Sequence, residues 1–308
     1  MVPHNQDKAR WFTIKDLERF SGVKAHTIRV WEQRYRLLSP GRSRGNIRMY
    51  SPDDVQRLLN VSLLLNIVPR ISAISRLHSS ELKQSVDAVS DPCLKRQKAL
   101  HHLIYYMYRD IEKFEDVLDA CVQCWGTDIT LEHVVLPFLE KASLLSYKDK
   151  TFETHFAVTA IRRKLILAIE NVQSAAISEK SAVLFLPMGE HFDLYLLYMA
   201  YVLKQKGLRV FYLGTNVSIN TLQNMMETNA PDMLFTFIPQ NQKFKLQDLA
   251  SFLKQQYPKT VLHAVTCNDS ENKKLNNVRF IFYKEIKMFD LRQYQIDRFA
   301  TVDKQLSN

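Results

Sequence analysis

Apolar residues recur along this chain with two different periods. Before about residue 175 they fall at intervals of three and four, which is the period of amphipathic helices. After Ser181, short and fully apolar runs alternate with helical stretches. That alternation is typical of buried strands in a parallel sheet. The pattern therefore predicts a helical first part and an α/β second part.

Two helix starts in the first eighty residues carry local signals. Thr13-Ile14-Lys15-Asp16 has the form of a capping box, and Gly22 can take the left-handed conformation that ends a helix. Ser51-Pro52-Asp53-Asp54 places Ser at the N-cap and Pro at the first helical position. A further helix is expected from about residue 24 to 34, and a short one over 71–77.

The helix over 24–34 has a core stripe and an opposite polar face. The stripe consists of Ile28, Trp31 and Tyr35. Its inward position turns three polar residues outward, namely His26, Arg29 and Gln33. Pro40-Gly41 and Gly45-Asn46 then punctuate a stretch that contains Arg42, Arg44 and Arg48. The predicted order is a helix, a turn, a second helix that is cationic, and a basic hairpin. This order is typical of proteins that present one helix to a DNA groove.

Four helices with short links are predicted next, from about residue 94 to 171. The breaks are Asp91-Pro92, Trp125-Gly126-Thr127 and 147–150. This spacing favours a small four-helix bundle. Beyond it, the strand-like runs are AVLFLP, RVFYLG, MLFTFI, TVLHAV and VRFIFY, separated by helices over 194–206, 219–228 and 246–256. Five such strands favour a doubly wound parallel sheet with flavodoxin-like order.

The charge of the chain is concentrated at its N-terminal end. The formal net charge is +10, and residues 1–70 hold 13 Lys and Arg against 6 Asp and Glu, so this quarter contributes +7. A local basic excess indicates a polyanion partner. The polar start MVPHNQDKARW does not look like a secretory signal, and no apolar run is long enough to cross a membrane. Four cysteines make no disulfide framework, so a cytoplasmic protein is expected.

Three motifs in residues 11–77 resemble the winged helix-turn-helix of MerR-family transcription regulators. They are Thr27-Ile28-Arg29-Val30-Trp31-Glu32, then Leu37-Leu38-Ser39-Pro40 followed by Arg42, and Arg48-Met49-Tyr50-Ser51 with Asp54. The resemblance and the outward face together predict nine DNA contacts: Lys24, His26, Thr27, Arg29, Gln33, Arg42, Arg44, Arg48 and Tyr50. Arginine can grip guanine or phosphate with a bidentate fork, and the wing residues would contact phosphates.

The rest of the chain resembles the cobalamin-sensing half of such regulators. Matching runs are Pro137–Lys141, His155-Phe156 through Leu165, Pro187-Met188-Gly189-Glu190 and Tyr212-Leu213-Gly214. The resemblance implies a helical cap over a flavodoxin-like domain that holds cobalamin. It gives three expected domains: a winged helix-turn-helix (10–79), a helical bundle (90–175) and a flavodoxin-like domain (180–300).

The residues that would hold cobalamin depart from that family. Its Gly-Glu/Asp-x-His-x-x-Gly motif reads here as Gly189 through Tyr195, so Phe192 replaces the cobalt ligand and Tyr195 replaces the last glycine. His191 is one residue away, about 100° around a helix. The cap positions read as Ser146 and Thr154-His155, and Val265 stands where a glycine is expected. Glu190 matches the acidic second position of the motif. We therefore expect no cobalamin and no other cofactor.

Other candidate chemistry is sparse. Cys121-x-x-Cys124 could suggest a metal, with Cys93 or His101-His102 as further ligands. A four-ligand zinc site needs two more ligands at matching spacing, and small apolar cysteines within an amphipathic helix usually just pack, so no metal site is predicted. With seven glycines in all, a phosphate-binding loop is not expected, and no catalytic constellation stands out.

The sequence therefore predicts a sequence-specific DNA-binding transcription regulator rather than an enzyme. Its C-terminal part would serve assembly or the sensing of another signal. The resemblance implies double-stranded DNA and further copies of the chain as partners, as a dimer or tetramer, with RNA polymerase as a further partner and no membrane. Two alternatives stay open: a cobalamin-dependent light-sensing repressor in which His191 is the shifted ligand, and a cobalamin-dependent mutase or methyltransferase subunit.

Overall fold

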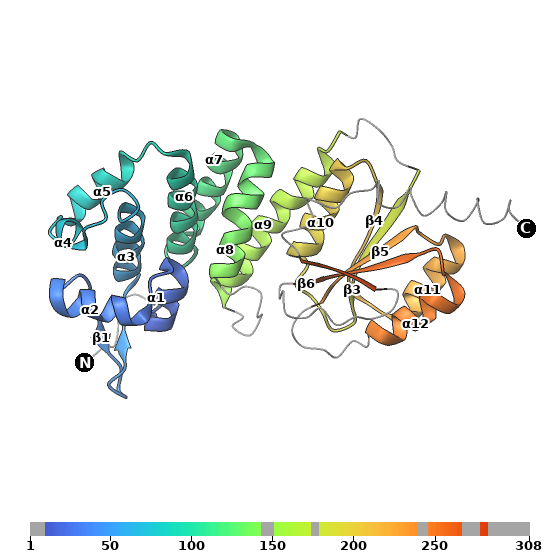
Figure 1. The fold of residues 1–308 in the computed structure, drawn as a ribbon, viewed down its shortest axis with the longest axis horizontal. Coiled ribbons are helices and arrows are strands. Elements are labelled where there is room, and N and C mark those ends of the chain that lie inside the picture. Colours follow the sequence, from blue (N-terminus) through green and yellow to red (C-terminus); the bar gives the residue numbers. More distant parts are fainter. Residues whose placement is uncertain (1–9, 143–150, 174–178, 239–245, 267–277, 283–308) are drawn as a thin grey trace, which may run out of the picture. The chain divides into compact units, whose positions relative to one another are not determined.

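A computed structural model describes residues 10–142, 151–173, 179–238, 246–266 and 278–282. The chain divides into two compact units, residues 1–161 and 162–308. Figure 1 shows the helical first unit and the α/β second unit. The change of apolar period along the sequence thus marks a real change of architecture.

The first part of unit 1 is a helix-turn-helix with a small wing, here called the head. It comprises α1 (Ile14–Ser21), α2 (Ala25–Tyr35), the antiparallel strands β1 (Gly41–Arg42) and β2 (Arg48–Met49), α3 (Pro52–Leu64) and α4 (Ile71–Ile74). Both expected capping boxes are present, at Thr13 and at Ser51. Gly22 ends α1 with φ of +77°, a left-handed conformation that glycine adopts without strain.

Helices continue through the rest of unit 1. They are α5 (Ser79–Asp87), α6 (Pro92–Met107), α7 (Ile111–Thr130), the π-helical turn η1 (Leu131–Val135), α8 (Leu136–Lys141) and α9 (Phe152–Glu170), which runs on into unit 2. The expected breaks at Asp91-Pro92 and Gly126 are present, and Gly126 has a non-helical φ of +76°. The break expected over 147–150 lies outside the described residues. Helix α5 and the break at Asp110, whose side chain caps α7, were not predicted.

The head packs against the bundle through an aromatic cluster. The Tyr108 ring lies 5.0 Å from the ring of Phe12 and 6.3 Å from that of Phe20, and the Arg10 guanidinium covers it at 4.8 Å. Lys141, at the end of α8, donates from Nζ to the carbonyl oxygen of Phe20 at 3.0 Å. A bundle residue thereby satisfies a carbonyl at the C-terminal end of α1, where helices leave such groups unpaired.

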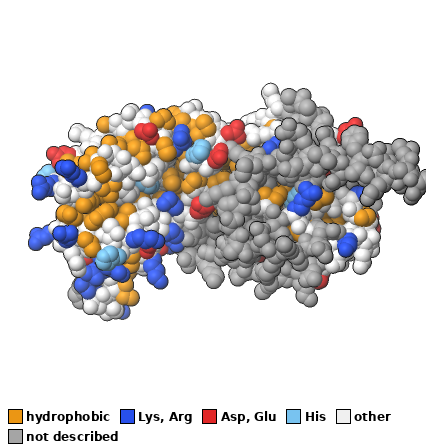
Figure 2. All heavy atoms as spheres, in the orientation of Figure 1, with side chains coloured by type: hydrophobic (Ala, Val, Ile, Leu, Met, Phe, Trp, Pro, Cys, Tyr) orange, Lys and Arg blue, Asp and Glu red, His pale blue; other side chains and the backbone are white. Residues whose placement is uncertain are grey.

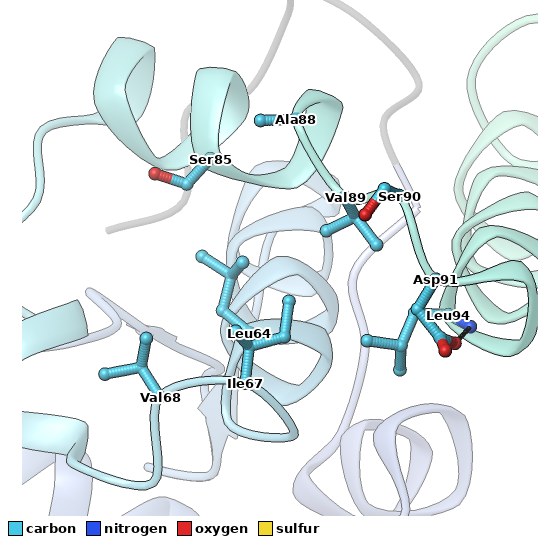
Figure 3. Close-up of a pocket in the computed structure, with 9 residues that line it drawn as sticks. All are labelled: Leu64, Ile67, Val68, Ser85, Ala88, Val89, Ser90, Asp91 and Leu94. Carbon is cyan, nitrogen blue, oxygen red and sulfur yellow. Dashed lines mark hydrogen bonds between the residues drawn. The ribbon is translucent and has the colours of Figure 1, made fainter.

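A shallow apolar hollow of about 400 Å³ lies where α5 and the start of α6 meet the end of α3 (Figure 3). Its lining is mostly aliphatic: Leu64, Ile67, Val68, Ser85, Ala88, Val89, Ser90, Asp91 and Leu94. The charged residue in this lining is Asp91, whose Oδ1 accepts from the backbone N–H of Leu94 at 2.8 Å. That carboxylate is therefore engaged in capping α6.

Unit 2 contains a five-stranded parallel sheet in the order β4-β3-β5-β6-β7. The strands are β3 (Ser181–Pro187), β4 (Arg209–Val217), β5 (Met233–Ile238), β6 (Val261–Thr266) and β7 (Val278–Phe282), with α10 (Leu194–Gln205), α11 (Ile219–Thr228) and α12 (Leu246–Gln256) between them. In order of occurrence this is 2-1-3-4-5, so the flavodoxin-like prediction is confirmed.

The strand order reverses direction after β4, which places the connecting helices on opposite faces of the sheet. Helices α11 and α12 pack on the face that carries Val183 and Phe185, through Leu222 and Leu249 among others (Figure 1). Helix α10 lies on the other face, and its first ten residues are all buried. In the described residues no helix is long and apolar enough to span a membrane.

His101 in α6 gives unit 1 a pH dependence. Its side chain is 3% exposed, and burial lowers its pKa to about 3, with the nearby charge of Lys141 acting in the same direction. A histidine in an unfolded chain titrates near 6.5. Between these values only the unfolded chain binds the proton, so stability falls as the pH drops from about 6.5 towards 3.

We expect the protonation of His101 alone to lower the free energy of unfolding of unit 1 by about 1 kcal/mol for each pH unit below pH 6. Urea unfolding followed by tryptophan fluorescence reports on unit 1, because all three tryptophans, Trp11, Trp31 and Trp125, lie in it. In His101→Leu the free energy of unfolding should fall less steeply between pH 6 and 4, by about 1 kcal/mol for each pH unit. His133, exposed on η1, provides the control His133→Leu. Equal acid sensitivity of His101→Leu and the parent chain would contradict the assignment.

Candidate nucleic-acid interface

Helix α2 presents most of its predicted DNA contacts to solvent. Lys24, His26, Arg29 and Gln33 are exposed, and Thr27 is half-buried. The outward face expected from the apolar stripe is therefore present, although of that stripe Ile28 is buried while Trp31 and Tyr35 are half-buried. Lys24 Nζ also lies 3.5 Å from a Glu18 carboxylate oxygen, but its side chain is 82% exposed. Such a surface pair is weak, so it leaves the cation available to a stronger anion.

The wing is held at its base by packing and at its tip by hydrogen bonds. A Cβ placed on Gly41 would lie 3.4 Å from the Trp11 ring, so the strand passes close against that indole. At the tip, Arg42 Nη1 donates to Asn46 Oδ1 at 2.6 Å, and Asn46 has a left-handed φ of +59°. Arg44 is exposed in the turn. Figure 2 shows Lys and Arg side chains gathered over the head on the face in view.

One carboxylate joins the wing to the recognition helix. Glu32, in α2, accepts from Arg48 Nε at 2.9 Å with one oxygen and from the Tyr50 hydroxyl at 3.0 Å with the other. The Glu32 side chain is 13% exposed, and Tyr50 is fully buried. Burial first, and then the hydrogen bond to Glu32, raise the pKa of Tyr50 above its usual value. We call Glu32, Arg48 and Tyr50 the wing clamp.

The wing clamp changes the expected role of two predicted contacts. Tyr50 was expected to add a phosphate hydrogen bond, but its ring is 0% exposed and its hydroxyl already donates to Glu32. Arg48 is half-buried and paired with the same carboxylate. Tyr50 is therefore placed to orient the wing rather than to reach a phosphate, and Arg48 Nε is engaged in the same clamp. The sequence carried a signal for this: Glu32 lies four residues after the buried Ile28, hence on the same helix face.

In unit 2 the loop after β3 is lined by aromatic residues. Tyr195 is fully buried at the start of α10, and its ring stacks on Phe237 of β5 at 5.1 Å with 6° between the planes. The Phe192 ring lies 6.0 Å from Tyr195 and is 9% exposed. His191 is exposed, and burial raises the pKa of Glu190, opposed by the charge of His191. The packing volume between α10 and β5 is occupied by rings.

An ion pair that sequence reasoning missed fixes the end of this loop. Asp193, 8% exposed, accepts from Arg162 of α9 through Nε at 3.0 Å and Nη2 at 2.7 Å. The Tyr212 hydroxyl of β4 also donates to Asp193 at 3.2 Å. Burial first, and then the carboxylate of Asp193, raise the pKa of Tyr212. Arg162 and Asp193 are 31 residues apart, and no spacing rule connects them.

A second tie holds the same loop to β4. The backbone N–H of Gly189 donates to Asn216 Oδ1 at 2.9 Å, and the Asn216 N–H donates to the Glu190 carbonyl oxygen at 3.2 Å. Gly189 and Asn216 both have positive φ, of +88° and +59°. Because asparagine tolerates this conformation better than most residues, its choice here fits the loop. The loop is thus closed by its own hydrogen bonds.

The cap positions lie partly outside the described residues. Ser146 is among the residues that the structure does not describe. Thr154 is 9% exposed near the start of α9, and its hydroxyl lies 3.0 Å from that of Thr151. His155 is exposed on the same helix. Thr154 therefore serves the helix start, and its hydroxyl is engaged locally.

The cysteine pair of α7 points in two directions. Cys121 is buried and Cys124 is exposed, as is Cys93. Burial raises the pKa of the Cys121 thiol to about 12, so the thiolate that binds metals is disfavoured. Within the described ranges, no group of three or more His, Cys, Asp and Glu side chains is placed to hold a metal ion.

Comparison with known proteins agrees with this geometry. Residues 12–81 match the MerR HTH family of regulatory proteins. The HTH-type transcriptional repressor CarA of Myxococcus xanthus is 25% identical over 227 residues, which cover 72% of this chain and 74% of CarA. The repressor CarH of the same organism is 23% identical over 81% of this chain and 86% of its own.

These alignments are longer than the head, so the likeness extends beyond it. Among solved structures, the monomethylamine corrinoid protein of Methanosarcina barkeri superposes with a TM-score of 0.47 at 11% identity, covering 62% of this chain and 94% of that one.

The head and the comparisons define the class of protein. An exposed cationic helix braced by a basic wing is a DNA-binding device, and residues 12–81 are a MerR-type helix-turn-helix domain. The chain is a DNA-binding transcription regulator that carries this domain at its N-terminal end and a flavodoxin-like domain at its C-terminal end.

Removing the carboxylate of the wing clamp should destabilise the head. Glu32→Ala leaves the Arg48 guanidinium and the buried Tyr50 hydroxyl without their acceptor, which we expect to cost about 2–4 kcal/mol in tryptophan-monitored urea unfolding. Glu18→Ala is the matched control, because it removes only the surface pair with Lys24. An equal loss in both variants would show that the clamp is no stronger than a surface ion pair.

Proposed function

We propose that this regulator reads a two-fold symmetric operator as a dimer or tetramer, through α2 in the major groove and the wing beside it. The proposal is supported chiefly by the exposed polar face of α2, which carries His26, Arg29 and Gln33. One helix-turn-helix reads only a few base pairs, and two-fold proteins read half-sites separated by whole helical turns. Arg29 is the residue to which we assign a base contact, because its fork matches guanine O6 and N7.

The remaining predicted contacts divide by what they would touch. Lys24, Thr27, Arg42 and Arg44 would contact phosphates and position the head. Arg48 and Tyr50 would act through the wing clamp. RNA polymerase is a further proposed partner, and the proposed location is the cytoplasm. We assign the chain no catalytic activity, in keeping with the names of its curated relatives, which are transcriptional repressors.

We further propose that the C-terminal domain does not bind cobalamin and serves assembly or another signal. The residues around the β3 loop do not fit that cofactor. A phenyl ring at Phe192 has no lone pair for cobalt, and Tyr195 stacked on Phe237 fills volume that a bound tail would need. Hydrogen bonds from Gly189 to Asn216 and from Arg162 to Asp193 fix the position of this loop. His191 is exposed and precedes Phe192, whereas the packed start of α10 follows Phe192.

Substitutions on the two DNA-facing elements should have different signatures. On a duplex selected from a random pool, Arg29→Ala should weaken binding by about 1–3 kcal/mol and relax the preference at one base pair. Arg44→Ala should weaken binding to all sequences and reduce the slope of log K against log salt by about 0.9. Lys254→Ala, exposed on α12, is the control and should change neither quantity.

Selection that yields no preferred duplex, even at low ionic strength, would reject the proposal. Light scattering on the selected duplex should give two or four protomers per operator. A single protomer both free and bound would reject the assembly.

Titration with adenosylcobalamin and methylcobalamin in the dark should show no shift of the corrin absorption bands. A known corrinoid protein run in parallel establishes that binding is detectable. Micromolar or tighter binding by this chain would overturn the proposal. If that binding were lost in His191→Ala, the ligand would be the neighbouring histidine, and the light-sensing alternative would apply.

A further inference from the structure

Strand β4 forms an open edge of the sheet in unit 2. Among the described strands it pairs with β3 on one side and with no strand on the other (Figure 1). Three consecutive side chains on it are large and apolar, yet Phe211 is 45%, Tyr212 38% and Leu213 37% exposed. Every residue of the neighbouring β3 is buried. Single exposed apolar residues need no explanation, but a run of three on a sheet edge does.

Strand β4 has few of the features that keep sheet edges from pairing. Natural edge strands carry charged residues, prolines or bulges that block a further strand. The sequence of β4 contains no proline, and its one charged residue is Arg209, at the first position. A shift of register relative to β3 comes after Tyr212, so that Gly214 is the next paired residue. The regular edge is therefore short, and beyond Arg209 it is uncharged.

The backbone groups of alternate residues on β4 face the open side. The N–H of Arg209 donates to the Lys180 carbonyl oxygen at 3.2 Å, so Arg209 turns its backbone towards β3. Direction alternates along a strand, so Val210 and Tyr212 turn their N–H and C=O groups away from β3. The Tyr212 hydroxyl donates to Asp193 at 3.2 Å, which helps to fix the strand at this point. Outward groups of this kind are a template for another strand.

We propose that β4 pairs antiparallel with β4 of a second copy of the chain, across a two-fold axis at Phe211. The register follows from the outward backbone groups. Val210 and Tyr212 lie symmetrically about Phe211, so Val210 of each copy would bond to Tyr212 of the other. Phe211 then faces its own copy in a non-hydrogen-bonded pair, where Cα atoms lie about 4.5 Å apart and side chains are closest. Two five-stranded sheets would join into one.

A second copy fits this edge because the pairing is self-complementary. Aromatic residues that face each other across two strands stabilise the pair, and like charges in that position destabilise it. The two Arg209 side chains would lie about 13 Å apart along the strands, so they do not meet. A stable interface buries about 800 Å² from each partner, and a short edge supplies only part of that. The contact therefore adds to others in the proposed dimer or tetramer, and this inference rests on that assembly.

A cysteine at the two-fold axis tests the register. Because a disulfide needs Cα atoms about 4.4–6.8 Å apart, Phe211→Cys should give an intermolecular disulfide under mild oxidation. Arg209→Cys, exposed on the same strand, is the matched control and should not cross-link, because its two copies lie too far apart. Both variants are made in the full chain with its four native cysteines replaced, Cys121 by alanine because it is buried and the others by serine. Non-reducing electrophoresis reads the product.

A charge at the same position tests the strength of the contact. Phe211→Lys would place two like charges opposite each other and put a charge on the edge. The concentration at which the assembly dissociates should then rise at least tenfold, measured by light scattering over a dilution series. Ile219→Lys is the control, because Ile219 is 40% exposed at the start of α11, outside the paired strand. Circular dichroism checks that both variants are folded.

The outcomes separate this interface from the assembly on which it rests. If the parent chain is a monomer at every concentration and on its selected duplex, the proposed assembly fails and this interface fails with it. If the parent chain assembles but Phe211→Cys gives no cross-link, only the β4 contact is refuted. Equal cross-linking at positions 209 and 211 would also refute it, because the encounter would then have no fixed register. The same holds if Phe211→Lys dissociates no more readily than Ile219→Lys.

Discussion

The arrangement of the DNA-binding surface depends on one buried carboxylate. Glu32 belongs to the recognition helix, yet its two oxygens bind Arg48 and Tyr50 at the exit of the wing. A buried charge of this kind is costly unless both oxygens are paired, and here both are. Helix and wing consequently share one orientation, because moving either would break a charge-assisted hydrogen bond. The wing clamp thereby sets the positions of solvent-facing residues such as Arg29 and Arg44 without contacting DNA itself.

Much of the fold was predictable from the sequence because it rests on local signals. The capping boxes at Thr13 and Ser51, the left-handed Gly22 and the apolar periods all act over a few residues, and the strand runs imply a parallel order directly. Helix α5 and the break at Asp110 escaped, since neither carries a strong periodic or glycine signal. The outward face of α2 followed from its core stripe.

The parts of the site that escaped prediction depend on contacts between distant residues. Tyr50 reads as a polar wing residue until the fold brings Glu32 to its hydroxyl. Asp193 reads as a loop acid until Arg162 and Tyr212 converge on it. In the same loop, the sequence could show that Phe192 and Tyr195 replace a histidine and a glycine. Only the structure shows that Tyr195 then stacks on Phe237 and completes a packed core.

The bond from Lys141 to the end of α1 has a consequence for how the chain folds during synthesis. Its donor and acceptor are 121 residues apart, and Tyr108 covers Phe12 and Phe20 across almost as long a separation. Contacts this distant form late, because the loop between them must first be closed. A head separated from the bundle would therefore lack these contacts. During synthesis the Phe20 carbonyl can therefore gain its bundle donor only after residue 141 has left the ribosome, whereas Tyr108 becomes available to cover Phe12 and Phe20 earlier.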